Sequence, residues 1–224
     1  MCDSVLIVSA TTNEAALVIK SMSGVETSPG VYGGVLAGRP VELLIGGIGA
    51  VAMTFRLTQL LSRRSCRFAM SMGIAGAFAG DIAIGEVVQI TDDCFSDLGI
   101  DDRGVFRSLS EAGLTGADEF PFNAGQIVNP LPMRSPYREV SGITVQTVSG
   151  SEQAINKLVE RYHPQVETME NAAFFYVCRM MQVPFVSFRA ISNRVEPRNR
   201  ESWQIKQAIG QMDKAICHLM NYMN

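Results

Sequence analysis

Metal-ligating and disulfide-forming residues are scarce in this chain of 224 residues. It contains only two histidines, and no two of its five cysteines stand at the spacing of a zinc-ligand pair. An odd number of widely separated cysteines is also a poor basis for a disulfide framework. The sequence therefore predicts a protein of a reducing compartment without a metal centre.

Long apolar runs and blocks of basic residues are also missing. No run has the roughly 20 apolar residues that a membrane-spanning helix needs, and the N-terminal segment lacks the basic residues of a signal peptide. The net charge is −3, which does not favour binding to nucleic acid. We therefore expect a cytoplasmic protein that binds neither membranes nor nucleic acid.

Apolar residues make up 47% of the chain and fall into short runs that alternate with helical patterns. The runs predict strands over 5–10, 35–45, 68–72, 85–91, 143–148 and 184–191. The helical patterns predict helices after residue 50, after Ser151, over 167–181 and over 203–223, whereas 92–142 is expected to be irregular. This alternation predicts a single α/β domain over 1–224, a three-layer αβα arrangement with a mixed, largely parallel central sheet.

A glycine-rich turn, Gly46-Gly47-Ile48-Gly49, separates a predicted strand from a predicted helix. With Ala52 it fits the G-x-G-x-x-A pattern of dinucleotide-binding proteins. That pattern also needs an acidic residue about 20 positions further on, but no Asp or Glu occurs between Glu42 and Asp81. NAD binding is therefore not predicted. The turn is either a tight connection or a place where backbone N–H groups approach a ligand.

Two features follow predicted strands, where open α/β sheets bind their ligands. Glu14 comes shortly after the first strand, although a lone Glu there is also typical of an ordinary surface. The segment Gly73-Ile74-Ala75-Gly76-Ala77 consists mostly of small residues. It suits close approach by a flat ring or a sugar, and close packing of a strand on a helix explains it equally well.

Two charged residues stand in apolar surroundings. Glu170 lies within the predicted helix in Met169-Glu170-Asn171-Ala172-Ala173, where a carboxylate is costly unless it is paired. Arg189 lies in the predicted strand that ends at Ser192-Asn193. A buried arginine needs an anionic partner, and Glu170 or Glu14 is the expected one.

Taken together and in this order, these pieces resemble the nucleoside phosphorylase/nucleosidase superfamily, especially the nucleosidases for methylthioadenosine and adenosylhomocysteine. The resemblance covers nearly the whole chain. It implies that Glu14 activates the attacking water, that Arg189 lies near this water, and that Met169 and Glu170 hold the ribose. It further implies that Asn193, after Ser192, meets purine N7. Gly73, Ile74, Ala75 and Gly76 would then line the sugar and the base. No metal or organic cofactor is implied.

One departure from the adenine-specific nucleosidases bears on the substrate. They carry Asp at the position of Asn193, whereas an Asn amide has two N–H groups and can donate to both O6 and N7 of a 6-oxopurine. Residues 192–203 and Asp97-Leu98-Gly99 also resemble the futalosine hydrolase family, which acts on a hypoxanthine nucleoside. Arg198 and Arg200 are the expected partners of the carboxylate at the far end of futalosine, unless their loop is simply solvated.

Three alternatives remain open at this point. A purine nucleoside phosphorylase would share the fold but needs basic residues for phosphate, and residues 3–19 contain none. An adenine-type nucleosidase is disfavoured by Asn193. A non-catalytic nucleoside-binding protein would have no need of a carboxylate where water attacks. The resemblance also implies a homodimer or a larger homo-oligomer.

Overall fold

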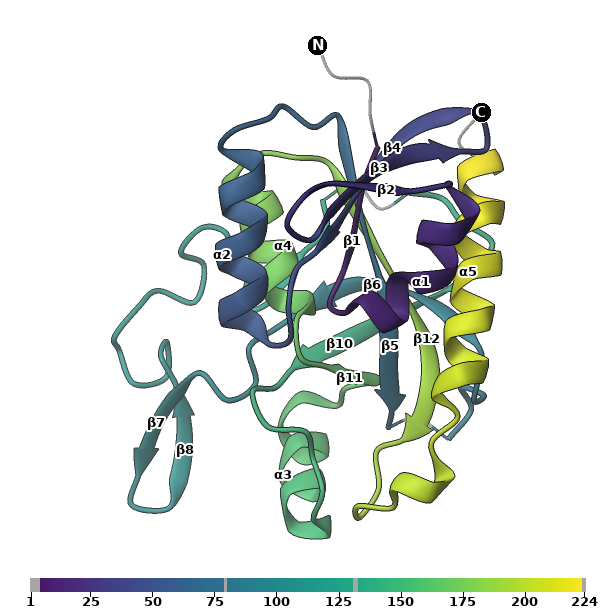
Figure 1. Cartoon of the computed structure of the whole chain (residues 1–224). Helices are drawn as coiled ribbons and strands as arrows, with labels where there is room; N and C mark the ends of the chain where they lie inside the picture. The colour runs from purple at the N-terminus through teal and green to yellow at the C-terminus, as the bar shows by residue number, and fades with distance from the viewer. Residues whose placement is uncertain (1–4, 79, 131–132, 223–224) are drawn as a thin grey trace.

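A mixed β-sheet covered by helices on both faces forms the body of the molecule (Figure 1). The computed structural model describes residues 5–78, 80–130 and 133–222. The strands are β1 (Val5–Ser9), β2 (Val25–Ser28), β3 (Val31–Leu36), β4 (Arg39–Ile45), β5 (Phe68–Ala77), β6 (Val87–Asp93), β7 (Gly99–Asp102), β8 (Val105–Ser108), β9 (Ile127–Val128), β10 (Arg138–Thr144), β11 (Val166–Thr168) and β12 (Phe185–Arg194). The helices are α1 (Thr12–Ser21), α2 (Ala50–Leu61), α3 (Glu152–Tyr162), α4 (Asn171–Met180), the 3-10 turn η1 (Arg200–Ser202) and α5 (Ile205–Tyr222).

The sheet runs in the order β11-β10-β6-β12-β5-β1-β4-β3-β2. Its centre, β4-β1-β5-β12, is parallel, which places the carboxyl ends of β1, β5 and β12 at one edge. Antiparallel pairing occurs along β2-β3-β4 and between β12 and β6. Strand β11 pairs with both β10 and β5, so that five strands close on themselves. The sheet is therefore mixed, with more antiparallel pairing than the sequence predicted.

The two faces of the sheet carry separate helix layers. Helices α1 and α5 cover one face, and α2 and α4 cover the other (Figure 1). On the α4 side, Phe174 and Phe175 pack on Phe185 of β12, with the ring centroids of Phe175 and Phe185 4.7 Å apart. Burying a side chain of this size stabilises the fold by roughly 1.5–3 kcal/mol. These layers hold β5 and β12 rigidly between them.

The glycines of residues 73–76 do not end a strand, contrary to the prediction. Strand β5 continues through them to Ala77, because β12 pairs along one side and β11 along the other. A side chain at Gly76 would meet Val195 at 2.8 Å. The small residues therefore permit close approach of neighbouring chain segments within a continuous strand.

Three other predictions of secondary structure were wrong in part. The helix predicted over 167–181 begins only at Asn171, since residues 166–168 pair with β10 as strand β11. Residues 92–142, expected to be irregular, contain the hairpin β7–β8 and the strand β9. The region 35–45, predicted as strand turned at residues 38–40, is the antiparallel hairpin β3–β4, but this hairpin begins at Val31 and β2 adds at its edge. Short or edge strands give too little periodic signal to be recognised.

The apolar residues of the helix predicted after residue 50 do not all face the core. Met53 and Leu57 of α2 are buried, but Val51 is 81% exposed and Phe55 is 65% exposed. Helix α5 begins at Ile205, two residues later than predicted, and the predicted end at residue 223 lies outside the described residues. Helix α3 follows its Ser151 cap as expected, with Ser151 Oγ accepting the N–H of Ala154.

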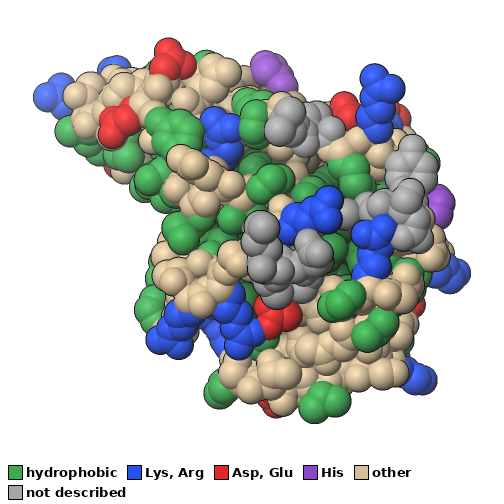
Figure 2. Space-filling view, turned by 90° about the horizontal axis from the view of Figure 1, so that it is seen from above, with side chains coloured by type: hydrophobic (Ala, Val, Ile, Leu, Met, Phe, Trp, Pro, Cys, Tyr) green, Lys and Arg blue, Asp and Glu red, His purple; other side chains and the backbone are tan. Residues whose placement is uncertain are grey.

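The surface shows charges of both signs. On the face seen in Figure 2, Lys and Arg side chains stand in separate groups among apolar and acidic ones. Across the described ranges, none of the helices combines the length and the apolar character that crossing a bilayer requires.

The turn before α2 depends on a glycine with positive φ. Gly47 has φ of 87°, and a Cβ there would lie 2.8 Å from that of Ala52. We expect Gly47→Ala to lower the free energy of unfolding by about 1–2 kcal/mol, because an L-residue is strained in this conformation. Gly210→Ala in α5 is the control. It meets nothing within 4 Å and should stabilise the protein by up to about 1 kcal/mol in chemical denaturation. Equal effects of the two substitutions would contradict the prediction.

Candidate active site

A cavity of about 360 Å³ opens at the carboxyl ends of β1, β5 and β12. This is where parallel strands of an α/β sheet place their ligands. Three carboxylates and two amides line it, from separate parts of the chain: Glu14, Glu167, Glu170, Asn13 and Asn193. Apolar side chains form the opposite wall, among them Ile48, Trp203, Ile205 and Ile209. A half-apolar cavity with a few convergent polar groups is typical of a small-molecule site.

Glu14 is fixed at the start of α1 by a capping box. Its Oε2 accepts from the backbone N–H of Thr11 at 3.1 Å and from the Thr11 hydroxyl at 2.8 Å. The Thr11 hydroxyl in turn accepts the N–H of Glu14. The other carboxylate oxygen, Oε1, accepts the N–H of Ile74 at 3.2 Å. The half-buried Glu14 carboxylate therefore connects α1 with β5, and its hydrogen bonds hold it in one orientation.

Glu170 lies at the N-cap of α4 and not within a helix, which corrects the sequence prediction. Its Oε1 accepts the N–H of Gly49 at 2.8 Å. Burial raises the pKa of the Glu170 carboxyl, while the bond from Gly49 and the field of Arg189 oppose this rise. The glycine-rich turn thus presents the backbone N–H of Gly49, and this N–H is already hydrogen-bonded to Glu170.

Arg189 is 3% exposed, and its partners are not the predicted ones. Its guanidinium donates to the hydroxyls of Ser71 at 3.0 Å and Ser187 at 3.1 Å, and to the Phe188 carbonyl at 2.8 Å. No carboxylate of the described residues stands within ion-pairing distance of it. Burial lowers the pKa of Arg189, and the fields of Glu170, Glu14 and Asp93 oppose this. The positive charge of Arg189 is therefore balanced by carboxylates that do not contact it directly.

Arg189 and Glu14 nevertheless share the space beside Gly73. A Cβ on Gly73 would lie 3.0 Å from Glu14 Oε1 and 3.6 Å from Arg189 Nε. Gly73 is buried at this point, while Ile74, Ala75 and Gly76 line the cavity together with Met169. The missing side chain at position 73 is what allows the carboxylate and the guanidinium to approach the same strand.

Asn193 presents a defined edge to the cavity. Its Nδ2 donates to the Arg194 carbonyl at 2.8 Å, and its Oδ1 accepts from the Ser192 hydroxyl at 2.8 Å. Exchanging the amide N and O would set two oxygens against each other at Arg194, so the orientation is fixed. One N–H is therefore left for a ligand, whereas the sequence analysis counted two.

Arg198 and Arg200 do not line the cavity. Arg198 lies over the ring of Trp203, 5.6 Å from its centroid, and Trp203 forms part of the wall. Arg200 is exposed in η1. The structure therefore connects Arg198 to the site through one aromatic ring and leaves Arg200 at the surface.

Glu167 was missed by the sequence analysis, which took it as the start of a helix. It is 5% exposed, lines the cavity and pairs across from Gly76, the residue that Asn193 faces from the other side. Its carboxylate accepts from the N–H of Ser149 at 3.2 Å and from the Ser149 hydroxyl. Burial raises its pKa, opposed by these bonds. A carboxylate inside the apolar run Val166-Glu167-Thr168-Met169 was the available signal.

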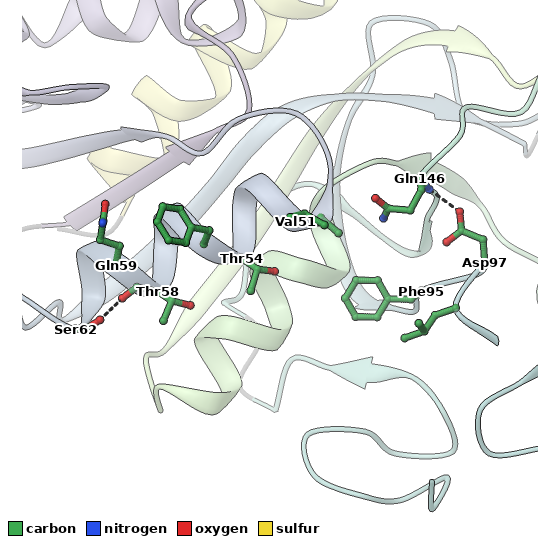
Figure 3. Close-up of a pocket in the computed structure, with 11 residues that line it drawn as sticks. Val51, Thr54, Thr58, Gln59, Ser62, Phe95, Asp97 and Gln146 are labelled. Atoms are coloured by element: carbon green, nitrogen blue, oxygen red, sulfur yellow. Dashed lines mark hydrogen bonds between the residues drawn. The ribbon is translucent and has the colours of Figure 1, made fainter. Parts of the chain in front are cut away.

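A second hollow of about 850 Å³ lies next to the site, along the outer face of α2 (Figure 3). Val51 and Thr54 of α2 face Phe95 and Gln146 across it, and the N–H of Gln146 donates to Asp97 at 2.6 Å. The hollow is lined by none of the candidate catalytic residues. Within the described parts of the chain, no group of three or more His, Cys, Asp or Glu is arranged to hold a metal ion.

The chain belongs to the phosphorylase superfamily, whose family profile matches residues 4–222. This agrees with the family resemblance predicted from the sequence.

Within this superfamily, the chain is similar to several individual proteins of known name. The chain is 27% identical over 188 residues to the futalosine hydrolase of Thermus thermophilus, covering 83% of each protein. It is 28% identical over 218 residues to that of Acidothermus cellulolyticus, covering 96% of this chain and 89% of the relative. The structure of the 5′-methylthioadenosine/S-adenosylhomocysteine nucleosidase of Neisseria meningitidis superposes with a TM-score of 0.81 at 18% identity, covering 99% of this chain and 100% of that one. This superposition confirms the predicted fold class.

The buried carboxylate of Glu170 has a consequence for the pH dependence of stability. Since its folded-state pKa is raised, folding favours the protonated form, and this stabilisation is lost as the pH rises through the folded-state pKa. Glu170→Gln carries no charge and can still accept from Gly49. Its stability relative to wild type should therefore increase between about pH 4 and about pH 8.

The measurement is urea denaturation at both pH values. Glu160→Gln, the same substitution at an exposed position of α3, serves as the matched control. A stability difference for Glu170→Gln that stays constant with pH would contradict the prediction.

Proposed function

We propose that this chain is a purine nucleosidase that hydrolyses the N-glycosidic bond of futalosine, releasing hypoxanthine and dehypoxanthine futalosine in menaquinone biosynthesis. One observation carries the proposal: Glu14, Glu170 and Asn193 reach the same cavity from three different strand ends or helix starts. The relatives named futalosine hydrolase support the choice of substrate.

The proposed reaction passes through a ribosyl cation. Glu14 accepts a proton from a water below C1′, and Arg189, which shares the space beside Gly73 with Glu14, orients this water. Glu170 binds the ribose hydroxyls, and its negative charge stabilises the cation. Met169 and residues 74–76 line the sugar and the base. Water attacks C1′ as the bond to the purine nitrogen breaks, and the bond electrons leave with the base. The base takes up a proton from solvent, and Glu14 returns its own proton to solvent.

Asn193 supplies the preference for a 6-oxopurine. Its Nδ2 donates one N–H to the Arg194 carbonyl, and we assign the other N–H as the donor to O6 of hypoxanthine, next to N7. Adenine carries an amino donor at position 6, so two donors would meet there. The preference therefore depends on this N–H reaching O6, because N7 is an acceptor in both purines, and Ser192 fixes the amide by donating to Oδ1.

The rival functions fit the cavity less well. Phosphorolysis requires a phosphate beside the ribose, but three carboxylates line the cavity and would repel it. Arg56, a basic residue of α2, donates to the Pro29 carbonyl and does not line the cavity. An adenine-type nucleosidase conflicts with the donor of Asn193. A binding protein would not need a carboxylate as firmly oriented as that of Glu14.

The deciding experiment is product analysis. The protein is incubated with futalosine, inosine and methylthioadenosine, each with and without phosphate. We expect free hypoxanthine from futalosine at a rate independent of phosphate. A ribose 1-phosphate product would indicate a phosphorylase, adenine release would indicate the adenine-type nucleosidase, and binding without products would indicate a binding protein.

Two further parts of the proposal concern surfaces outside the cavity. We propose that two copies of the chain pair through the outer face of α2, where Val51 and Phe55 are exposed beside Leu98. Large apolar side chains grouped in this way are typical of an interface.

We also propose that Arg198, held on Trp203, binds the distal carboxylate of futalosine with Arg200 nearby.

Glu14→Gln should reduce kcat by about 10²- to 10⁴-fold, because the amide cannot accept the proton of water. Binding and folding should be retained, since Gln also completes a capping box. Steady-state kinetics and thermal unfolding measure the two effects. Glu152→Gln, the same change in the first turn of α3, is the matched control. Turnover within a few-fold of wild type would remove Glu14 from the mechanism.

Asn193→Asp should lower the ratio of kcat/KM for hypoxanthine nucleosides over adenine nucleosides by about tenfold or more. The substitution replaces the fixed N–H donor by a carboxyl group, and one lost hydrogen bond is worth about 1 kcal/mol or more. Competition between inosine and adenosine substrates measures the ratio. Asn199→Asp makes the same change on the exposed loop and should leave the ratio unaltered. An unchanged ratio in Asn193→Asp would refute the role of Asn193.

A further inference from the structure

Asp93 is a buried carboxylate outside the cavity that the proposed mechanism does not use. It ends β6, is 0% exposed and accepts from the Thr144 hydroxyl at 2.9 Å and from Asn171 Nδ2 at 2.8 Å. Burial raises its pKa to about 7, while the two hydrogen bonds and the field of Arg189 oppose the rise. A fully buried acid is costly and needs compensation by the surrounding structure.

Asp93 and Arg189 are opposite charges, both buried, and neither has an ionic partner in direct contact among the described residues. Two neutral side chains join them. Arg189 donates to the Ser187 hydroxyl at 3.1 Å, Ser187 donates to Asn171 Oδ1 at 2.5 Å, and Asn171 donates to Asp93 at 2.8 Å. All four side chains are buried.

The direction of these hydrogen bonds is uniform. The single hydroxyl hydrogen of Ser187 points to Asn171, which leaves its oxygen to accept from Arg189. The Asn171 amide presents its oxygen to Ser187 and its nitrogen to Asp93. Every donor therefore points from the cation toward the anion. Dipoles aligned in this way between opposite charges strengthen one another in a low-dielectric interior.

The same groups fix the start of α4. The Thr144 hydroxyl that donates to Asp93 also accepts the N–H of Ala172 at 2.8 Å. Asn171 is the first residue of α4 and directly follows Glu170. Asp93 is therefore connected to two functional side chains, to Arg189 through Ser187 and to Glu170 through the helix start.

We propose that Asp93 is the remote counter-ion of Arg189, and that the chain Asp93–Asn171–Ser187 is a positioning device that holds the guanidinium charged and oriented beside Glu14. Asp93, Asn171 and Ser187 touch no substrate in this scheme. The inference rests on the proposed nucleosidase function. Asp93 then affects kcat through Arg189, whereas substrate binding depends on Glu170 and Asn193.

The test is a set of matched variants assayed with futalosine. Asp93→Asn keeps the shape and can keep the Asn171 contact but removes the charge. Ser187→Ala disconnects Asp93 from Arg189. Both should lower kcat about tenfold with KM within about twofold of wild type, and the double variant should be no worse than either single one. Asp92→Asn, the same substitution one residue earlier, should leave kcat unchanged.

Ser71→Ala separates positioning through Asp93 from simple loss of a hydrogen bond. It also removes one hydroxyl from Arg189 but leaves the chain to Asp93 intact. Its effect should be smaller than that of Ser187→Ala and should add to that of Asp93→Asn. Equal effects of the two serine variants, additive effects of Asp93→Asn and Ser187→Ala, or wild-type kcat in either would overturn the proposal. If Asp93→Asn does not fold, the comparison of the two serine variants decides.

The same variants distinguish this inference from the proposed function. Absence of futalosine turnover in the wild type would refute the function and not the positioning chain. The chain is then tested by the same double-mutant cycle in the free energy of unfolding. Coupling of Asp93→Asn with Ser187→Ala but not with Ser71→Ala supports it, and additivity in both pairs overturns it.

Discussion

The charged groups around the cavity are satisfied by neutral donors and acceptors instead of by one another. Glu14 accepts from Thr11 and Ile74, Glu170 from Gly49, and Glu167 from Ser149. Direct ion pairs would neutralise these carboxylates and hold them away from a substrate. Backbone amides and hydroxyls hold them equally firmly and leave their charge available, which the stabilisation of a developing cation requires.

This arrangement explains much of the local structure. A backbone N–H can serve Glu170 only if the turn before α2 brings Gly49 close to it, and that turn requires the positive φ of Gly47 and Gly49. The Thr11 cap serves Glu14 and α1 at once. Helix starts and strand ends are therefore arranged around the carboxylates, and the core layers behind them keep the supporting backbone in place.

The family resemblance anticipated from the sequence that Glu14, Glu170 and Asn193 would meet at one site, although it was the structure that placed Glu170 at the N-cap of α4. Their hydrogen-bonding partners could not be anticipated. An arginine in an apolar strand indicates that an anion is needed somewhere, but not that hydroxyl and amide groups will connect it to Asp93 at the end of another strand. Glu167 was missed because a three-residue strand has too short a period to be told from a helix start.

The exposure of Val51 and Phe55 on α2 could not be derived from the sequence. Helical spacing identifies apolar positions but not which of two adjacent faces the sheet covers, and Phe55 and Leu57 lie on different ones. The glycines of residues 73–76 were interpreted as a strand end because their propensity is low. Pairing on both sides by β11 and β12 outweighs that propensity.

That double pairing also determines how a ligand enters and leaves. The floor of the cavity at Gly76 belongs to two hydrogen-bonded ladders at once, so its amides should be among the slowest in the molecule to exchange with solvent deuterium. A floor that cannot open leaves the opposite wall, where Trp203 and Ile205 lie, as the route for release of the products. The rate of turnover of the proposed reaction would then depend on the segment between β12 and α5, which carries none of the carboxylates of the cavity.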